Sequence, residues 1–241
     1  MLKITKYLLN LLYDHKRIMI YGLQRSGTNF IKDAVASNFY ISLLNVDNPR
    51  NNPSHKHYRP YSQKKFPTDQ YITHDDPESL TELECMFEHN PPKWYVVVSK
   101  SPYSWLLSYE KWAKRCDWPD CNHHYIEEWN LFYGTWLEWR KSSNNVLLVR
   151  YIDMLRDPKG ECGRICEKMG LTRRWKSYSG KLTPERVDHS PDFDSSRRRY
   201  YLEREYLSQY STEKWESLRT YLNADVVRGL GYELRDRPKC K

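Results

Sequence analysis

The sequence predicts an α/β fold in which a central parallel β-sheet is flanked by helices in a three-layer arrangement. Three short apolar runs, residues 18–21, 94–98 and 146–149, have the length and composition of strands buried on both faces. Each run is followed by apolar residues at helical spacing, and this alternation is typical of βα units. A functional site is therefore expected at the carboxyl ends of the strands.

The other elements follow from the same periodicities along the chain. Residues 2–13 predict a short amphipathic helix, and residues 39–46 a weaker fourth strand. Apolar side chains return at helical spacing over 199–232, which predicts helices that pack on the same core. Helices are also predicted over 28–38, 77–89, 103–115, 125–141 and 158–169. The charged segments 47–70 and 173–199 are long for connections and are expected to be functional or mobile loops.

Length and composition limit the class of protein. We expect one domain over residues 1–241, with core motifs at 17–171 and a mostly helical part with a ligand-binding loop at 172–241. The net charge of +8 predicts a surface that attracts anions, including phosphorylated or sulfated ligands and nucleic acid. No run of 18 apolar residues and no secretory segment is found, so a soluble, cytoplasmic protein with free thiols is expected.

A glycine-rich loop, residues 22–28 (GLQRSGT), follows the first strand and leads into a helix. Two glycines let the backbone wrap an anion, and the first N–H groups of the helix add donors and a favourable dipole. A nucleoside triphosphate site needs lysine directly after the second glycine, where this chain has Thr28, and its loop cation is Arg25. The loop therefore predicts an anion site that is not an ATPase loop; the simpler alternative is a strand–turn–helix with a glycine bend.

A second polar group follows the strand at 94–98. Ser101 and Pro102 are typical of a helix start, so Lys100 is expected at the strand end and Ser108 two turns into the helix. The ammonium and the hydroxyl could converge on another phosphate. A capped helix beside a solvated lysine explains the same residues.

Together, in this order, the two groups resemble sulfotransferases that use 3′-phosphoadenosine 5′-phosphosulfate (PAPS), which have a P-loop NTPase-like fold. In that family a Ser-Gly-Thr-like loop binds the 5′-phosphosulfate, and an arginine with a serine eight residues later binds the 3′-phosphate. Lys100 stands in place of that arginine, as a point charge without a bidentate fork. Residues 146–158 and 169–171 are also similar to the family, so the resemblance covers residues 17–171.

The resemblance implies a transferase that moves a sulfuryl group in line from PAPS to a hydroxyl of a small molecule or glycan, leaving adenosine 3′,5′-diphosphate (PAP). Arg25 would neutralise developing charge, and the base would be His57 or His74. No metal is implied. The residues implied to bind the nucleotide are Gly22, Gln24, Arg25, Ser26, Gly27, Thr28, Asn29, Lys100, Ser108, Arg197, Arg198 and Arg199.

Three other hypotheses are weighed against this one. A nucleotide or small-molecule kinase with a degenerate loop is the main alternative, and Thr28 argues against it. A nucleic-acid-binding module fits the positive charge, but no recognised motif supports it. A zinc site would need tighter paired spacings than the chain shows in Cys116, Cys121, His123 and His124. Aromatic residues crowd positions 103–139, where several could stack on a sugar or aromatic acceptor.

Overall fold

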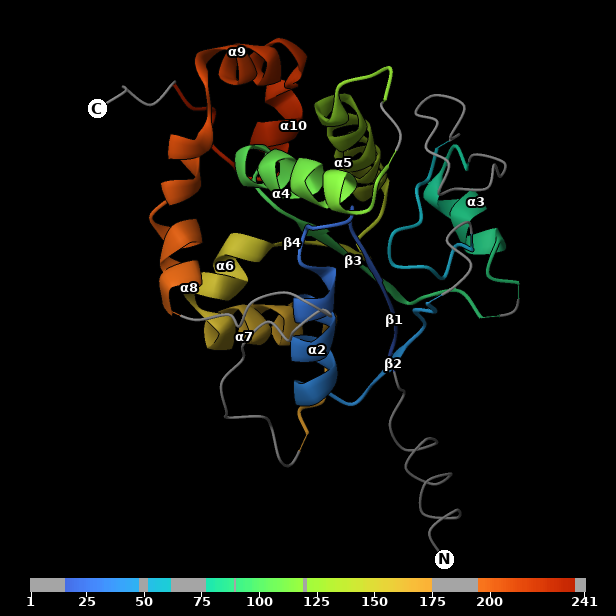
Figure 1. Cartoon of the computed structure of the whole chain (residues 1–241). Coiled ribbons are helices and arrows are strands. Elements are labelled where there is room, and N and C mark those ends of the chain that lie inside the picture. Colours follow the sequence, from blue (N-terminus) through green and yellow to red (C-terminus); the bar gives the residue numbers. More distant parts are fainter. Residues whose placement is uncertain are drawn as a thin grey trace, which may run out of the picture.

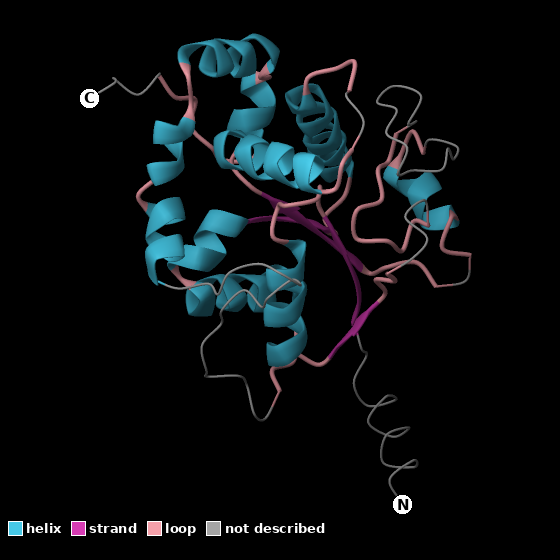
Figure 2. Cartoon of the chain, viewed as in Figure 1, coloured by secondary structure: helices cyan, strands magenta, loops and turns pink. Residues whose placement is uncertain are grey.

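The computed structural model describes residues 16–47, 52–61, 77–88, 90–118, 121–174 and 195–236. Within these ranges an all-parallel sheet with the order β2-β1-β3-β4 lies between two helical layers (Figures 1 and 2). Helices α4 and α5 cover one face, and α2, α6 and α7 cover the other. The three-layer α/β architecture predicted from the sequence is confirmed.

The bounds of the elements are as follows. The strands are β1 (Lys16–Tyr21), β2 (Ile41–Leu43), β3 (Trp94–Ser99) and β4 (Val146–Arg150). The helices are α2 (Thr28–Asn38), α3 (Leu80–Cys85), α4 (Pro102–Arg115), α5 (Tyr125–Ser142), α6 (Tyr151–Arg156), α7 (Pro158–Met169), α8 (Ser195–Leu202), α9 (Thr212–Tyr221) and α10 (Ala224–Gly229), with the 3₁₀ helix η1 (Glu205–Gln209) between α8 and α9.

The central strands are apolar runs because both faces of the sheet are covered. Residues 18–21 of β1 and 95–98 of β3 are at most 1% exposed. Strand β1 pairs with β3 from Ile18↔Trp94 to Tyr21↔Val97, and β3 pairs with β4 up to Ser99↔Arg150. After β1 the chain continues to β2, which pairs with β1 on one side, whereas β3 pairs with β1 on its other side. The loops after β1 and β3 therefore flank a switch point of the sheet, where ligands bind in open α/β folds.

Local capping explains why most predicted helices have the expected bounds. Helix α7 starts at Pro158 because the Asp157 carboxylate accepts a hydrogen bond from the backbone N–H of Gly160. It ends at Gly170, whose φ of 59° is the left-handed conformation typical of helix ends. Helix α2 has the predicted bounds, and α4 and α5 differ from prediction by one residue.

Three elements differ from the prediction, each for a local reason. Helix α3 covers only part of 77–89, because Ser79 caps its start and Glu88 has a φ of 53° just beyond its end. Strand β2 covers only part of 39–46, because Phe39 and Val46 each form an isolated bridge to another segment. Helix α6 was not predicted as a separate helix, since it follows β4 directly with no intervening loop.

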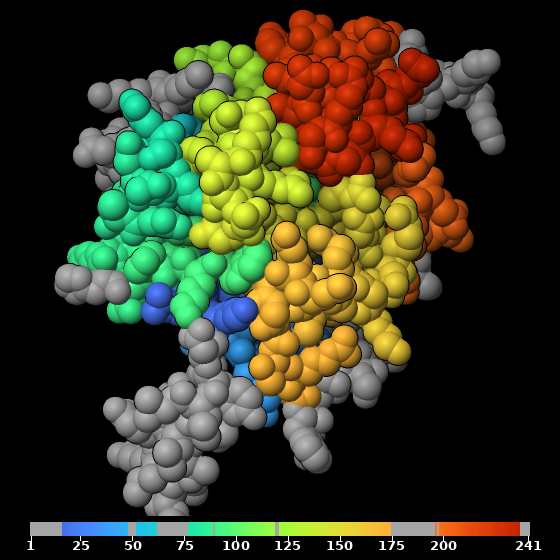
Figure 3. Space-filling view, turned by 180° about the vertical axis from the view of Figure 1, so that it is seen from behind, coloured from blue at the N-terminus to red at the C-terminus, as the bar shows by residue number. Residues whose placement is uncertain are grey.

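The C-terminal helices pack on the same core, as predicted. Helices α9 and α10 both contact α5, and Figure 3 shows these red C-terminal helices directly against it. Tyr201, Tyr206, Trp215 and Val227 are buried within the main apolar cluster. Residues 2–13 lie outside the described residues, and so does most of 173–199. No helix in the described ranges is long and apolar enough to cross a membrane.

Candidate active site

The glycine loop after β1 has the close backbone packing that its two glycines allow. A Cβ at Gly22 would lie 2.7 Å from the carbonyl oxygen of Val98 in β3. Gly27 has a φ of 93°, and a Cβ there would lie 2.4 Å from the ring of Tyr151. Arg25 also has a positive φ, 69°. The loop is therefore wedged between β3 and the start of α6, with its backbone turned as in an anion cradle.

The side chains of this loop supply donors suited to an anion. Gln24, Ser26 and Thr28 are buried. The Ser26 hydroxyl donates to the backbone carbonyl of Leu23, whereas Nε2 of Gln24 is a buried donor with no hydrogen-bond partner among the described residues. An orphaned buried donor is costly unless a ligand or water satisfies it. Asn29 at the start of α2 accepts a hydrogen bond of 2.9 Å from Nζ of Lys56. The residues present thus fit a phosphate or sulfate group.

Arg25 extends from the loop toward α4. Its guanidinium carbon lies 4.9 Å from the centre of the Trp112 ring, within the range of a cation–π interaction. Trp112 is one turn beyond Ser108, so both side chains lie on the same face of α4. This face of α4 runs alongside the loop.

Lys100 and Ser108 meet as their eight-residue spacing suggested. Nζ of Lys100 donates to Oγ of Ser108 at 2.9 Å and to the Tyr201 hydroxyl at 3.0 Å. Lys100 is only 5% exposed, so its charge is held among hydroxyls and aromatic rings instead of in bulk water. Its ammonium also lies 5.4 Å from the centre of the Tyr151 ring.

Tyr151 connects the two polar groups. The same ring that closes over Gly27 in the glycine loop faces the ammonium of Lys100. The two groups therefore flank one aromatic side chain at the carboxyl edge of the sheet. A ligand with two separate anionic groups would bridge them.

A cavity of about 210 Å³ adjoins Lys100 and Tyr151. It lies between the start of α4, α6, α8 and the segment after α10, and it is large enough for a phosphate group, since a water molecule occupies about 30 Å³. Its lining is basic: it contains two carboxylates, Asp153 and Glu233, against five cations. These cations are Lys100, Arg150, Arg156, Arg204 and Arg235.

His57 lies against the glycine loop. Its Nδ1 is 2.6 Å from the carbonyl oxygen of Gly22, and because a carbonyl only accepts, Nδ1 carries the proton and Nε2 is left as an acceptor. Burial lowers the pKa of His57 well below its usual value, and the cations Lys56 and Arg59 act in the same direction, although the Gly22 hydrogen bond opposes them. A neutral imidazole with an unprotonated nitrogen has the form that a general base needs.

A buried ion pair ties the His57 segment to the glycine loop and the helices. The side chains of Arg59 and Glu128 are 1% exposed and form a direct contact between the 52–61 segment and α5. Arg59 also donates to Oε1 of Gln24 at 3.0 Å, and Glu128 accepts from the hydroxyls of Tyr61 and Tyr109. Part of the predicted loop 47–70 is thus packed in the core.

The remaining predicted residues have other surroundings. His74 lies outside the described residues, as does the side chain of Arg197. Arg198 and Arg199 are in helix α8, not in a loop; one donates to the Arg156 carbonyl and the other pairs with Glu205. Their binding to the nucleotide stays a prediction.

One residue of the zinc alternative, His124, has a structural role. His124 caps α5: its Nδ1 accepts from the N–H of Ile126, while its own N–H donates to Glu127. In the described part of the chain, no three histidine, cysteine or carboxylate side chains are grouped as metal ligands would be.

Several residues of the candidate site were not predicted from the sequence. Tyr151 could have been identified, because it follows a predicted strand at its carboxyl end. Tyr201 is 101 residues from Lys100 and carries no local signal. The Arg59–Glu128 pair likewise joins segments 69 residues apart.

Comparisons with known proteins find similar structures but no similar sequences. No family model and no curated protein matches the chain. Among solved structures, it is similar to the mouse sulfotransferase SULT7A1 complexed with PAP, with 12% identity, a TM-score of 0.48, and coverage of 90% of this chain and 87% of that one. It is also similar to the sulfotransferase domain of the Synechococcus PCC 7002 olefin synthase, with 18% identity, a TM-score of 0.35, and coverage of 69% and 61%.

Proposed function

We propose that this protein is a sulfotransferase that moves a sulfuryl group from PAPS to the hydroxyl of a small molecule or glycan. The observation that carries the proposal is the position of two polar groups on either side of Tyr151, the glycine loop on one side and Lys100 on the other. PAPS and PAP have anionic groups at both the 5′ and 3′ positions, whereas ATP has a single phosphate chain. A cytoplasmic location is part of the same proposal.

In such a reaction, different residues of the chain have different roles. PAPS supplies the sulfuryl group. The backbone N–H groups at the start of α2, with Gln24 and Thr28, bind and orient its 5′ end. Arg25 neutralises the charge that develops on the bridging oxygen, as a preorganised cation in a partly buried loop. Nε2 of His57 accepts the proton of the acceptor hydroxyl.

The test is a transfer assay with ³⁵S-labelled PAPS and a panel of acceptors that includes phenols, neutral sugars and acidic glycans. We expect label in at least one acceptor and stoichiometric formation of PAP. A parallel assay uses ATP labelled in the γ-phosphate. Phosphate transfer from ATP, with no sulfuryl transfer to any acceptor, would replace the proposal by the kinase alternative.

A further inference from the structure

Lys100 donates hydrogen bonds to two hydroxyls, those of Ser108 and Tyr201, and these two residues have different surroundings. Oγ of Ser108 donates its own proton to the carbonyl oxygen of Ser104 at 3.0 Å, and Ser108 does not line the cavity. Tyr201 does line the cavity, together with Lys100. Of the two residues, Tyr201 of α8 is therefore the one that borders the cavity.

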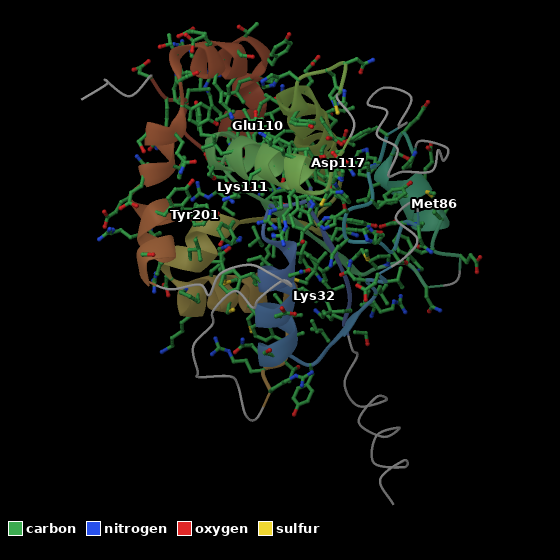
Figure 4. All side chains as sticks on the ribbon, viewed as in Figure 1. Lys32, Met86, Glu110, Lys111, Asp117 and Tyr201 are labelled. Carbon is green, nitrogen blue, oxygen red and sulfur yellow. The ribbon has the colours of Figure 1, made fainter. Side chains whose placement is uncertain are left out.

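Tyr201 is held firmly in this position. It is 7% exposed and lies on the side of α8 that faces the rest of the molecule (Figure 4). Its ring centre is 4.3 Å from the ammonium of Lys100 and 5.4 Å from that of the Tyr151 ring. Rings that surround the side chain restrict its rotamers, so little entropy is lost when the hydroxyl binds a ligand.

Lys100 and Tyr201 together can offer an anion more than lysine alone can. An ammonium is a point charge, whereas tight recognition of phosphate usually uses two parallel donors. A phenol that accepts a hydrogen bond from an ammonium becomes a stronger donor through its own O–H, because linked hydrogen bonds polarise one another. Lys100 and Tyr201, 3.0 Å apart, together present a charge and a second donor.

We propose that Tyr201 is a nucleotide-binding residue that donates, beside Lys100, to the 3′-phosphate, while Ser108 only positions the lysine. This inference rests on the proposed function, and it assigns to α8 a determinant of selectivity for 3′-phosphorylated nucleotides. The cations Arg150, Arg204 and Arg235 add a positive potential around the pair.

The test compares the affinities of each variant for PAP and for AMP, which lacks the 3′-phosphate. The PAP-to-AMP affinity ratio within one variant cancels general effects on folding. We expect Tyr201→Phe to lower this ratio about 10-fold, as for loss of a hydrogen bond to a charged group. Ser108→Ala should lower it less than threefold, and the control Tyr200→Phe on the same helix should leave it unchanged.

The possible outcomes separate this inference from the proposed function. A wild-type protein that prefers PAP, with the same preference in Tyr201→Phe, overturns the role of Tyr201 and leaves the proposed function standing. A larger loss in Ser108→Ala than in Tyr201→Phe also overturns it. A wild-type protein with no preference for PAP over AMP overturns the proposed function and this inference together.

Discussion

Glu128→Gln is expected to lower the free energy of unfolding by about 3–5 kcal/mol, the usual cost of breaking a buried ion pair from one side. The neutral amide has the same size, but it leaves the guanidinium of Arg59 buried without its counter-charge. Urea unfolding followed by circular dichroism measures the change. The glycine loop should also be held less firmly, because Arg59 donates a hydrogen bond to Gln24 in that loop.

The control for this variant is Glu138→Gln on the same helix. Glu138 is 68% exposed and pairs with Lys141, which is 73% exposed, so its replacement should change stability little. Equal effects of the two substitutions would show that the Arg59–Glu128 pair does not organise the core around the site.

His57→Asn is expected to lower kcat for sulfuryl transfer by about 10²–10⁴, the range of general base catalysis, with little change in the affinity for PAP. The variant removes Nε2, the nitrogen that the Gly22 hydrogen bond leaves unprotonated. Transfer from labelled PAPS measures kcat, and titration with PAP measures binding. His55→Asn should have a smaller effect, because His55 accepts a hydrogen bond from the backbone N–H of His57 and its replacement leaves the imidazole of His57 in place. Loss of activity in His74→Asn, with full activity in His57→Asn, would assign the base to His74.

The lowered pKa of His57 also predicts how the protein responds to acid. The neutral base persists below pH 6.5, so the acid limb of the kcat/KM profile should lie below the usual histidine pKa. When the pH falls through about 6.5, the unfolded chain binds a proton at this histidine before the folded one does, and the folded state loses stability. Urea unfolding at pH 7.5 and 5.5 should show this loss, and His57→Asn should reduce it. An acid limb at or above pH 6.5 would contradict a buried neutral base.

The sequence was sufficient for the features that depend on near neighbours in the chain. Continuous apolar runs predicted β1, β3 and β4, because strands covered on both faces need apolar side chains throughout. The helix start at Ser101 and Pro102 predicted that Lys100 and Ser108 could converge, since a strand end and a position two helical turns later lie at the same edge, and the two side chains form a hydrogen bond.

The features that were missed depend on contacts between distant segments. Tyr201 reaches Lys100 through the packing of α8 on α6, and a tyrosine in a charged segment gives no local sign of this. Arg59 lies in segment 47–70, which was expected to be a functional or mobile loop; its burial depends on Glu128 of α5. Helix α6 escaped prediction because six residues are too few for periodicity to separate a helix from a strand end.

The central claim is that the glycine loop and Lys100 form one site for a nucleotide with two anionic groups, and thermal unfolding with PAP, AMP, ADP and ATP tests it most directly. At 100 times its dissociation constant, PAP should stabilise the protein by about 2.7 kcal/mol and raise Tm by roughly 5–10 °C. Gly27→Ala should abolish this shift, because its Cβ would clash with Tyr151, whereas Gly163→Ala, which meets no atom closer than 3.9 Å, should keep it. A shift with ATP but not with PAP, or no shift with any nucleotide, would contradict the account.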